Sequence, residues 1–425
     1  MKKILSLALV LVMLLGCVAA FSACGGKDED NTVDTDKDSV STDGETGSED
    51  KDALKDIKIG FIFLHDEKST YDLNFMNAAR DAQAALGLTD DQVLFKTNVE
   101  ESNECYEAAA ELADMGCDIV FADSFGHEEF MIKAAKEFPN VQFCHATGTM
   151  AHTEKLDNFH NAFASIYEGR YLTGIAAGMK LNAMIEAGDI TEAEAKLGYV
   201  GAFTYAEVIS GYTSFYLGAK SVCPSATMAV QFTGSWYDAT AEREAALALM
   251  DAGCKVISQH ADSMGAPSAC EENGVPNVFY NGTTIDTCPN TYAISSRINW
   301  APYFEYIITQ CANGKAIDTD WCYGLEEGSV ELFDINTAVC AEGTQEAIDN
   351  AKAGLAAGTL HVFDTATFTV GGEAVTSYLA DVDTDAAYTG DTEVVSDGYF
   401  HESEYRSAPY FDLRIDGIEL LNEKY

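Results

Sequence analysis

The side chains in this sequence with the clearest capacity for chemistry are aromatic rings and carboxylates that follow short apolar runs. Trp236 comes just after the apolar run 228–232, and His260 and Asp262 come just after a second run that contains Val256 and Ile257. Rings stack on the faces of a flat ligand, and carboxylates accept hydrogen bonds from its N–H or O–H groups. Basic side chains are scarce at these positions. The pattern therefore predicts a pocket for a flat, polar ligand that is neutral or cationic, and it does not suit a phosphate, sulfate or carboxylate.

The residues predicted to contact the ligand come from loops and helix starts that follow predicted strands in both halves of the chain. They are Tyr71, Asp72, Asn74, Phe75, Ser124, Phe125, Glu129, Phe203, Trp236, His260, Asp262, Asn281 and Asn299. Several of them have a structural alternative. A ring such as Phe75, inside an amphipathic helix, is often core, and Asp72 and Asp262 are also suited to helix capping. A lone histidine such as His260 more often makes a structural hydrogen bond, and Glu207 is expected to face solvent.

A repeat that occurs twice in the chain predicts how these residues are positioned. Residues 110–124 and 246–263 each have a helical apolar spacing, then Gly-Cys, then a β-branched run, then a polar tip that ends in Asp-Ser. The glycine can adopt the left-handed conformation that ends a helix, and a short apolar run suits a strand covered on both faces. Ligands of open α/β sheets bind outside the carboxyl ends of the strands. The two copies therefore predict two similar lobes that share one cleft.

Predicted strands and helices alternate along most of the chain, which indicates βαβ units and parallel sheets. The fold class predicted is α/β, with two doubly wound parallel-sheet lobes joined by a hinge. Residues 57–165 and 296–320 are expected to form the N-terminal lobe. Residues 166–295 and 321–425 are expected to form the C-terminal lobe and a tail.

The N-terminus has the pattern of an exported lipoprotein. Two lysines precede an apolar run from Ile4 to Ala20, and small residues precede Cys24. This resembles a bacterial lipoprotein signal, in which residues 1–23 are removed and Cys24 is acylated; Cys17 fits loosely, and a plain secretory signal is the alternative. Residues 24–56 have almost nothing to bury, which predicts a disordered acidic linker. Because no later apolar run approaches the ~20 residues of a membrane span, the protein is expected outside the cytoplasm, held to the cell membrane by lipid.

Charge and cysteine content exclude several classes of protein. The chain has 25 basic and 69 acidic residues, a net charge of −44, so no nucleic-acid partner is expected. Cys311 and Cys322 are predicted to form a disulfide, whereas Cys117 and Cys254 precede buried strands and are expected to behave as small apolar residues. No Cys/His cluster suggests a metal, no GxSxG, P-loop or HExxH motif suggests an enzyme, and no cofactor is expected.

Six segments carry a resemblance to a known family. They are Ser124–His127, Cys144–Gly148, Tyr167–Leu172, Gly234–Asp238, Gln259–Ser263 and Asn299–Tyr303. Together they resemble the basic membrane protein family, the substrate-binding lipoproteins of ABC importers, and the similarity runs in order from about Ile57 to Phe363. The resemblance implies a type I periplasmic-binding-protein fold, a purine nucleoside or purine base as ligand, and an ABC transporter permease as partner.

The resemblance also implies roles for single residues. Phe75 and Trp236 match the two rings that stack on opposite faces of the purine, and Glu129 falls where the family usually has an aspartate. The chain departs from the family at Met76, where an asparagine is usual, and at Asn281, where an aspartate is often found. Three functions are compatible with the sequence: a receptor for an ABC importer, a sensory binding protein of the same fold, and, less favoured, an extracellular nucleoside hydrolase.

Overall fold

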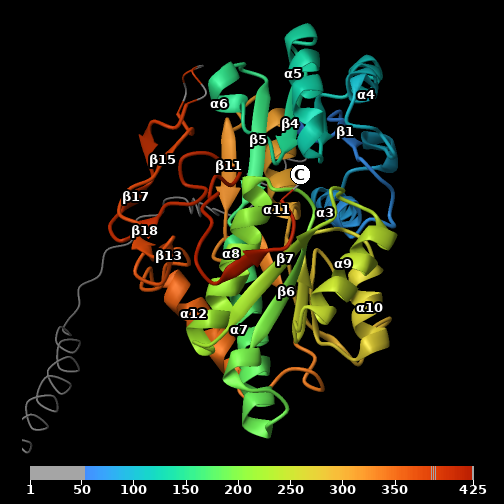
Figure 1. Cartoon of the computed structure of the whole chain (residues 1–425). Coiled ribbons are helices and arrows are strands. Elements are labelled where there is room, and N and C mark those ends of the chain that lie inside the picture. The colour runs from blue at the N-terminus through green and yellow to red at the C-terminus, as the bar shows by residue number, and fades with distance from the viewer. Residues whose placement is uncertain (1–52, 384, 386, 388, 424–425) are drawn as a thin grey trace, which may run out of the picture. The chain divides into compact units, whose positions relative to one another are not determined.

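The computed structural model describes residues 53–383, 385, 387 and 389–423, which belong to one compact unit, Thr46–Tyr425 (Figure 1). The predicted signal peptide, Cys24 and most of the predicted linker lie outside the described residues. Within the described ranges, no helix combines the length and the apolar content that a membrane span needs.

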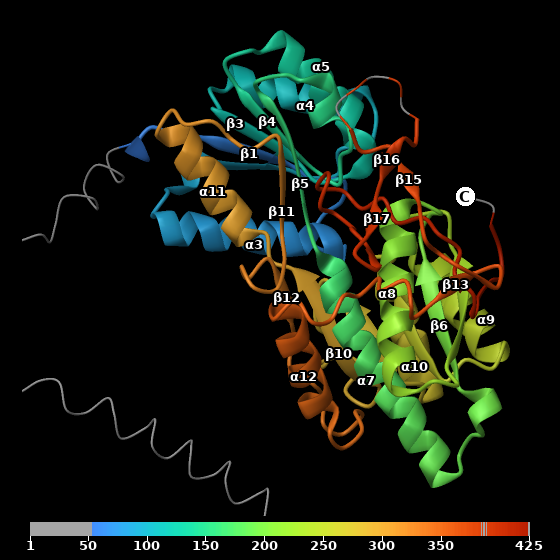
Figure 2. The same ribbon diagram turned by 90° about the vertical axis from the view of Figure 1, so that its left-hand side faces the viewer.

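Among the described residues, the N-terminal lobe is built on a parallel six-stranded sheet of order β2-β1-β3-β4-β5-β11. Helices α3 and α11 cover one face of this sheet, and α4 and α5 cover the other (Figures 1 and 2). All four residues of β1 are buried, as expected for a strand covered on both faces. The elements are β1 (Ile59–Ile62), α3 (Thr70–Leu86), β2 (Val93–Lys96), α4 (Asn103–Asp114), β3 (Ile119–Ala122), α5 (Glu128–Glu137), β4 (Gln142–Ala146), α6 (Ala151–Glu154), β5 (Phe159–Ala164), α11 (Ala301–Ala312) and β11 (Asp320–Tyr323).

The C-terminal lobe repeats this plan on a seven-stranded sheet of the described chain, of order β19-β7-β6-β8-β9-β10-β12. Its strands are parallel except that β12 runs antiparallel to β10. Helices α7 and α8 cover one face, α9 and α10 cover the other, and α12 packs on α7. The elements are α7 (Ile166–Ala187), β6 (Lys196–Gly201), α8 (Ala206–Val222), β7 (Thr227–Phe232), α9 (Ala239–Asp251), β8 (Val256–Gln259), α10 (Gly265–Asn273), β9 (Asn277–Tyr280), β10 (Tyr292–Ile298), β12 (Val330–Leu332), α12 (Thr344–Ala356) and β19 (Ile418–Leu420).

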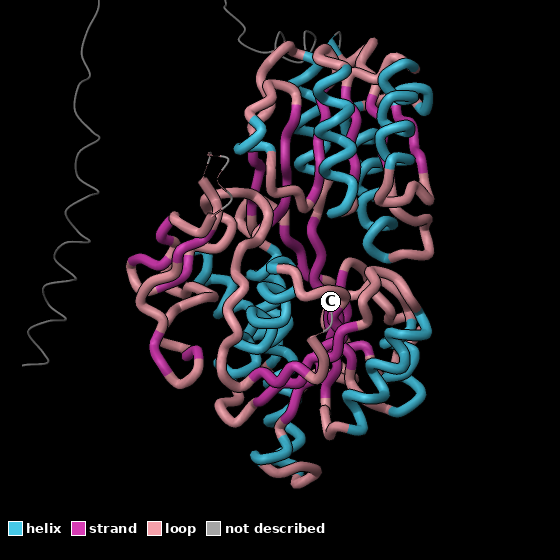
Figure 3. The backbone as a smooth tube through the Cα atoms, turned by 45° about the horizontal axis from the view of Figure 1, so that its top comes forward, coloured by secondary structure: helices cyan, strands magenta, loops and turns pink. Residues whose placement is uncertain are grey.

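The two copies of the sequence repeat occupy equivalent places in the two lobes. In the first copy α4 leads into β3, which lies beside β1; in the second α9 leads into β8, which lies beside β6. The turn glycines Gly116 and Gly253 have φ of 83° and 89°, a backbone conformation that glycine adopts without a Cβ penalty. The predicted fold class, two doubly wound α/β lobes, is therefore confirmed, and Figure 3 shows the two sets of strands one above the other.

Three segments of the described chain cross between the lobes: β5 to α7, β10 to α11, and β11 to β12. The second and third crossings differ from the expected boundaries at 296 and 321. Strand β10 continues to Ile298, because Ser296–Ile298 also pairs with β12 of the C-terminal lobe. Residues 320–323 pair with β5 and belong to the N-terminal sheet. An apolar run predicts a strand, but it does not show which of the two sheets contains the neighbouring strand, and the lobe boundaries depend on this pairing.

The segment beyond α12 wraps around the C-terminal lobe and reaches the N-terminal lobe (Figures 1 and 2). Phe363, Phe400 and Phe411 pack into the core beneath α7 and α8, and β19 pairs with β7. The Ser407 hydroxyl donates to Asp320 of β11 at 2.7 Å. Three short hairpins complete this part of the described chain: β13 (Thr369–Val370) with β14 (Glu373–Ala374), β15 (Leu379–Ala380) with β16 (Thr392–Glu393), and β17 (Val395–Ser396) with β18 (Tyr399–Phe400).

The predicted disulfide between Cys311 and Cys322 is wrong, because both thiols are free. The Sγ atom of Cys322, on β11, lies 3.7 Å from Ser165 Oγ, whereas Cys311 lies near the end of α11. The two thiols therefore have different neighbours. Cys117 and Cys254 are buried free thiols, and burial raises the pKa of each to about 11, so both remain protonated apolar groups at neutral pH.

Candidate functional site

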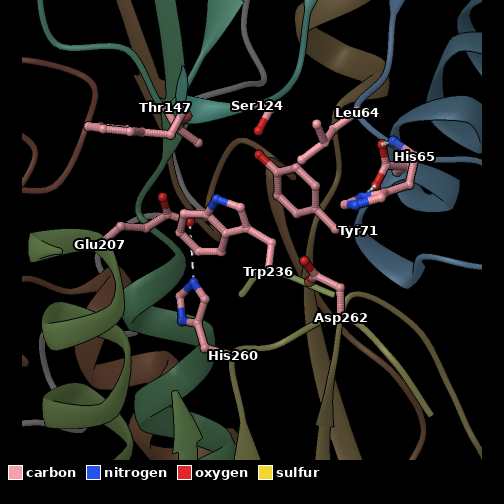
Figure 4. Close-up of a pocket in the computed structure, with 11 residues that line it drawn as sticks. Leu64, His65, Tyr71, Ser124, Thr147, Glu207, Trp236, His260 and Asp262 are labelled. Carbon is pink, nitrogen blue, oxygen red and sulfur yellow. Dashed lines mark hydrogen bonds and ion pairs between the residues drawn. The ribbon is translucent and has the colours of Figure 1, made fainter. Parts of the chain in front are cut away.

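A cavity lies between the two lobes, at the carboxyl ends of strands from both sheets. Its empty space is about 350 Å³, with open solvent at its mouth included. Figure 4 shows Tyr71 and Ser124 reaching in from the N-terminal lobe and Trp236, His260 and Asp262 from the C-terminal lobe. The lining residues are Leu64, His65, Tyr71, Asp72, Ser124, Phe125, Thr147, Glu207, Trp236, His260 and Asp262.

Seven of the thirteen predicted site residues line this cavity: Tyr71, Asp72, Ser124, Phe125, Trp236, His260 and Asp262. They lie in the loop after β3, the first turn of α3, and the loops after β7 and β8. The rule that ligands meet the carboxyl ends of parallel strands was therefore sufficient to place them at one edge of each sheet.

Trp236 is the largest aromatic side chain of the cavity, and its loop is held in place from several sides. Its indole contacts the edge of Phe203 with ring centroids 5.0 Å apart, and Phe203 in turn stacks on Tyr205 at 5.1 Å. Phe203 therefore supports Trp236 from outside the cavity instead of lining it. The Trp236 carbonyl accepts a hydrogen bond from the Asp262 N–H at 2.9 Å, and Asp238 caps α9. The indole itself is only half-buried, so a ligand can reach it.

Phe75 does not reach the cavity, which corrects the predicted stack of Phe75 and Trp236 about a ligand. The Phe75 ring is fully buried and stacks on Trp300 inside the N-terminal lobe, with centroids 4.6 Å apart. Tyr71, one helical turn earlier, lines the cavity instead, and its hydroxyl donates to the Asp123 carbonyl at 2.8 Å. Residues four apart lie on the same side of a helix, so spacing alone could not decide which ring is core and which faces the cleft.

Four further predicted residues do not line the cavity. Asn74 donates to the carbonyl of Ile298 at 2.8 Å, and Asn299 donates to the carbonyl of residue 328 at 3.1 Å, so both brace the interlobe crossings. Asn281 has φ of 61° after β9, and its N–H is bonded to the next strand. Glu129 is exposed on α5. The side chains of Asn74 and Asn299 are bonded to backbone carbonyls and Glu129 lies on the outer surface, which loop position does not reveal. Asn281 is buried, and within the described structure its side-chain amide nitrogen has no hydrogen-bond partner.

Four lining residues were not predicted: Leu64, His65, Thr147 and Glu207. Glu207 was expected to face solvent, but the start of α8 turns it into the cleft, where Oε1 lies 3.2 Å from His260 Nε2. The matching plan of the two lobes contained a signal that Glu207 faces the cleft. Glu207 is the second residue of α8, as Tyr71 is the second residue of α3, and both helices follow the equivalent strand of their lobe.

Two carboxyl groups, Asp72 and Asp123, are neighbours in the N-terminal wall of the cavity. Asp72 lines the cavity, and Asp123 lies behind it. Burial tends to raise the pKa of Asp72, but hydrogen bonds from His65 and Ser69 outweigh burial and the net shift is downward. Burial raises the pKa of Asp123 well above its ordinary value, and the adjacent Asp72 raises it further. On this wall the surroundings therefore favour the charged form of Asp72 and the protonated form of Asp123.

The lobes touch each other beside the cavity. The backbone carbonyl of Asp262 accepts hydrogen bonds from both the N–H and the hydroxyl of Thr70, at 3.1 Å and 3.0 Å. Phe125 of the N-terminal lobe lies 5.0 Å from Tyr205 of the C-terminal lobe, centroid to centroid. Burial raises the pKa of the Asp262 carboxyl well above its usual range, and the nearby Glu242 raises it further. These contacts enclose the cavity from two sides.

The chemistry of the lining is that of recognition by stacking and hydrogen bonding. Among the described residues that line the cavity there is no lysine or arginine, while three carboxyl groups, three aromatic rings and two hydroxyl side chains of Ser124 and Thr147 are present. Such a lining does not neutralise an anion. It suits a flat ligand that offers hydrogen-bond donors.

Two α/β lobes of matching strand order, with a cavity between them, have the architecture of the type I periplasmic solute-binding proteins. The chain belongs to the Bmp family, described as ABC transporter substrate-binding protein PnrA-like, whose sequence profile matches residues 80–356. The family and fold are those of solute-binding proteins, which are not enzymes.

Individual relatives agree with this assignment. The chain is 31% identical over 283 residues to a purine-binding protein of Brucella abortus, covering 66% of this chain and 76% of the relative. It is 34% identical over 217 residues to a putative ABC transporter glucose-binding protein of Haloferax volcanii, and this similarity spans about half of each chain, 51%. A solute-binding protein of an ABC transporter system from Conexibacter woesei has a similar fold, with a TM-score of 0.57 at 20% identity over 72% of this chain and 98% of that one.

Proposed function

We propose that this protein captures a purine base or purine nucleoside between its lobes and delivers it to the permease of an ABC importer. The observation that carries the proposal is the half-buried indole of Trp236, set in a cavity whose charged groups are carboxyls. A purine has two flat faces for stacking and N–H groups that carboxylates accept. Tyr71 and Phe125 offer the opposing aromatic surface from the N-terminal lobe.

The purine-binding relative from Brucella abortus supports a purine as ligand. The putative glucose-binding relative from Haloferax volcanii makes a sugar the second candidate ligand. Aromatic rings and carboxylates also suit a sugar. The three aromatic rings of Trp236, Tyr71 and Phe125 favour a flat heterocycle, because both of its faces can then stack on a ring.

Identification of the bound molecule tests the proposal most directly. Protein purified without dialysis is denatured, and the released small molecules are identified by mass spectrometry. Calorimetric titration of the ligand-free protein with adenine, inosine and glucose then measures affinity. We expect a purine in the extract and saturable binding of adenine or inosine. Glucose binding without purine binding would contradict the proposal and favour a sugar receptor.

Two further measurements separate transport from sensing and from catalysis. A strain that lacks the protein is expected to lose uptake of radiolabelled adenine or inosine, whereas a sensory binding protein would leave uptake unchanged. Incubation of the protein with inosine is expected to leave the nucleoside intact, because a binding protein releases its ligand unchanged. Free hypoxanthine in that incubation would favour the nucleoside hydrolase.

The proposed site of action is the outer face of the cell membrane, with the protein held by a lipid on Cys24. The basic n-region, the apolar run and the small residues before Cys24 support the anchor. Residues 24–56, at roughly 5–6 Å × √n, would let the two lobes work roughly 30 Å from the bilayer, within reach of a permease.

A further inference from the structure

Arg170 is a fully buried cation beside the cavity, and among the described residues no carboxylate forms an ion pair with it. It lies on α7 just after the first interlobe crossing. One amino group, Nη1, donates to the Gln259 carbonyl at 2.9 Å, and the guanidinium lies over the Tyr280 ring at 3.3 Å from its centroid. The other, Nη2, lies 3.4 Å from His260 Nδ1. A buried charge without an anionic partner is costly, which points to a role for this position beyond packing.

The contact between Arg170 and His260 determines which nitrogen of the imidazole carries the proton. A guanidinium has donors and no acceptor, so His260 Nδ1 has to accept from Nη2 and cannot carry a hydrogen. The Tyr199 hydroxyl, 3.3 Å from the same nitrogen, is likewise placed to donate. Neutral imidazole then carries its hydrogen on Nε2, which donates to Glu207 Oε1 at 3.2 Å.

Glu207 is the last residue of the hydrogen-bonded series Arg170–His260–Glu207 and, like His260, it lines the cavity. Among the described residues, His260 is the one recorded hydrogen-bond partner of its carboxylate, so Oε2 is left for a ligand that offers a donor. Helix α8 leaves room for the imidazole at Gly211, one turn after Glu207, where a Cβ atom would lie 3.0 Å from His260 Nδ1. A side chain at position 211 would therefore press against the ring.

We infer that Arg170 is a positioning residue for ligand binding: it fixes His260 in the Nε2–H tautomer, and His260 in turn holds Glu207 as a hydrogen-bond acceptor facing the ligand. The inference rests on the proposed function only in taking a purine N–H as the donor that Glu207 receives. The tautomer of His260 does not depend on the identity of the ligand, and it can be measured in the ligand-free protein.

Removal of Arg170 changes the proton balance of His260 in a definite direction. The groups that face the imidazole are Arg170 of α7, Tyr199 of β6, Glu207 of α8 and Tyr280 of β9, with Asp262 two residues along its own loop. Burial lowers the pKa of His260, the bond to Glu207 raises it, the Arg170 charge lowers it, and the net shift is downward. Without Arg170 the pKa of His260 rises, although burial still lowers it. The donor that keeps Nδ1 free of hydrogen is also lost, so Nδ1 can carry the hydrogen in place of Nε2.

The first test measures the tautomer by long-range proton–nitrogen NMR of the ligand-free protein, with His260→Gln used to assign the ring signals. We expect wild type to show a protonated Nε2 and an acceptor Nδ1 from pH 6 to 8. The variant Arg170→Gln is expected to show a mixture of the Nε2–H and Nδ1–H tautomers, with more of the doubly protonated form at pH 6 than wild type. A protonated Nδ1 in wild type, or an unchanged His260 spectrum in Arg170→Gln, overturns the inference.

The second test measures adenine and inosine affinity by calorimetry from pH 6 to 8. We expect Arg170→Gln to weaken binding about 10- to 100-fold at pH 7 and further at pH 6, Arg170→Lys to recover part of the loss, and wild type to change little over the range. The matched control is Arg406→Gln, which removes a half-buried arginine that donates to the Asp381 carbonyl in the tail and does not line the cavity. It is expected to bind as wild type does.

A double-variant cycle separates positioning from a merely structural effect. In His260→Gln the side-chain amide can still donate to Glu207 but has no tautomer to fix and no proton to gain. Arg170→Gln is therefore expected to cost much less affinity, and to cause no pH dependence, in the His260→Gln background. An equal loss in both backgrounds would mean that Arg170 only supports the fold. If wild type binds neither adenine nor inosine, the proposed function fails, and the NMR result still decides the assignment for Arg170.

Discussion

The aromatic residues Trp236 and Phe75 provide a sharp test of which rings serve the ligand and which serve the fold. Trp236 is half-buried at the cavity, whereas Phe75 is fully buried on Trp300. An offset aromatic stack contributes about 0.5–1.5 kcal/mol beyond area burial, and the burial of the ring against a ligand adds to this. Trp236→Ala should therefore weaken purine binding by about 1.5–4 kcal/mol, or about ten- to a thousand-fold in Kd.

The stability of the ligand-free protein should be reduced more by Phe75→Ala than by Trp236→Ala. Phe75→Ala removes a ring from the core of the N-terminal lobe and should lower the free energy of unfolding by about 3–5 kcal/mol. Trp236→Ala should cost less, because the indole is partly exposed without ligand and its main neighbour, Phe203, keeps its own stack on Tyr205. Phe75→Leu is a milder companion that keeps an apolar side chain in the same space, for use if the alanine variant fails to fold.

Calorimetric titration with adenine or inosine and thermal melting of each variant distinguish the two roles. The expected pattern is a large loss of affinity with a small change in Tm for Trp236→Ala, and a fall in Tm of several degrees for Phe75→Ala or Phe75→Leu. Affinity within twofold of wild type in Trp236→Ala, together with a large fall in Tm, would refute the assignment of Trp236 to the cavity. A fall in affinity without loss of stability in Phe75→Leu would indicate that Phe75 contacts the ligand.

Two further predictions concern stability and localisation. Burial raises the pKa of Glu242 to about 7 from 4.5. Between these two pH values the folded state binds more protons than the unfolded state. The free energy of unfolding should therefore fall by up to about 3 kcal/mol as the pH rises from 4.5 to 7, and then level off. Denaturant titrations of Glu242→Gln, whose amide can still accept the Ser263 N–H, should show a smaller pH slope than wild type. Part of the slope remains because the pKa of Glu402 is also raised to about 7 and those of Asp123 and Asp262 are raised; an unchanged slope would contradict the buried-carboxyl argument. Cys24→Ala should abolish partitioning into a detergent phase, measured beside a Cys17→Ala control that should partition like wild type; retention of Cys24→Ala in the detergent phase would argue against Cys24 as the anchor.

The sequence alone was sufficient for the features that depend on local periodicity. The helical spacing before Gly116 and Gly253 and the apolar run after each predicted a helix, a left-handed turn and a buried strand, and both copies form these elements. Two copies of one supersecondary unit in turn predicted two lobes of the same plan. Seven cavity residues followed from the position of loops at the carboxyl ends of these strands, because topology places those loops at a common edge.

Tertiary structure decided what local periodicity leaves open. Tyr71 and Phe75 share a helix face, and only the position of Trp300 makes one of them core and leaves the other at the cleft. Glu207 lies in the cavity, where His260 meets it and Arg170 in turn contacts His260, although its own neighbours in sequence indicate a solvent-exposed residue. Periodicity determines which side chains point in the same direction, but the free energy of each position depends on what the other elements place opposite it, and those partners come from residues far away along the chain.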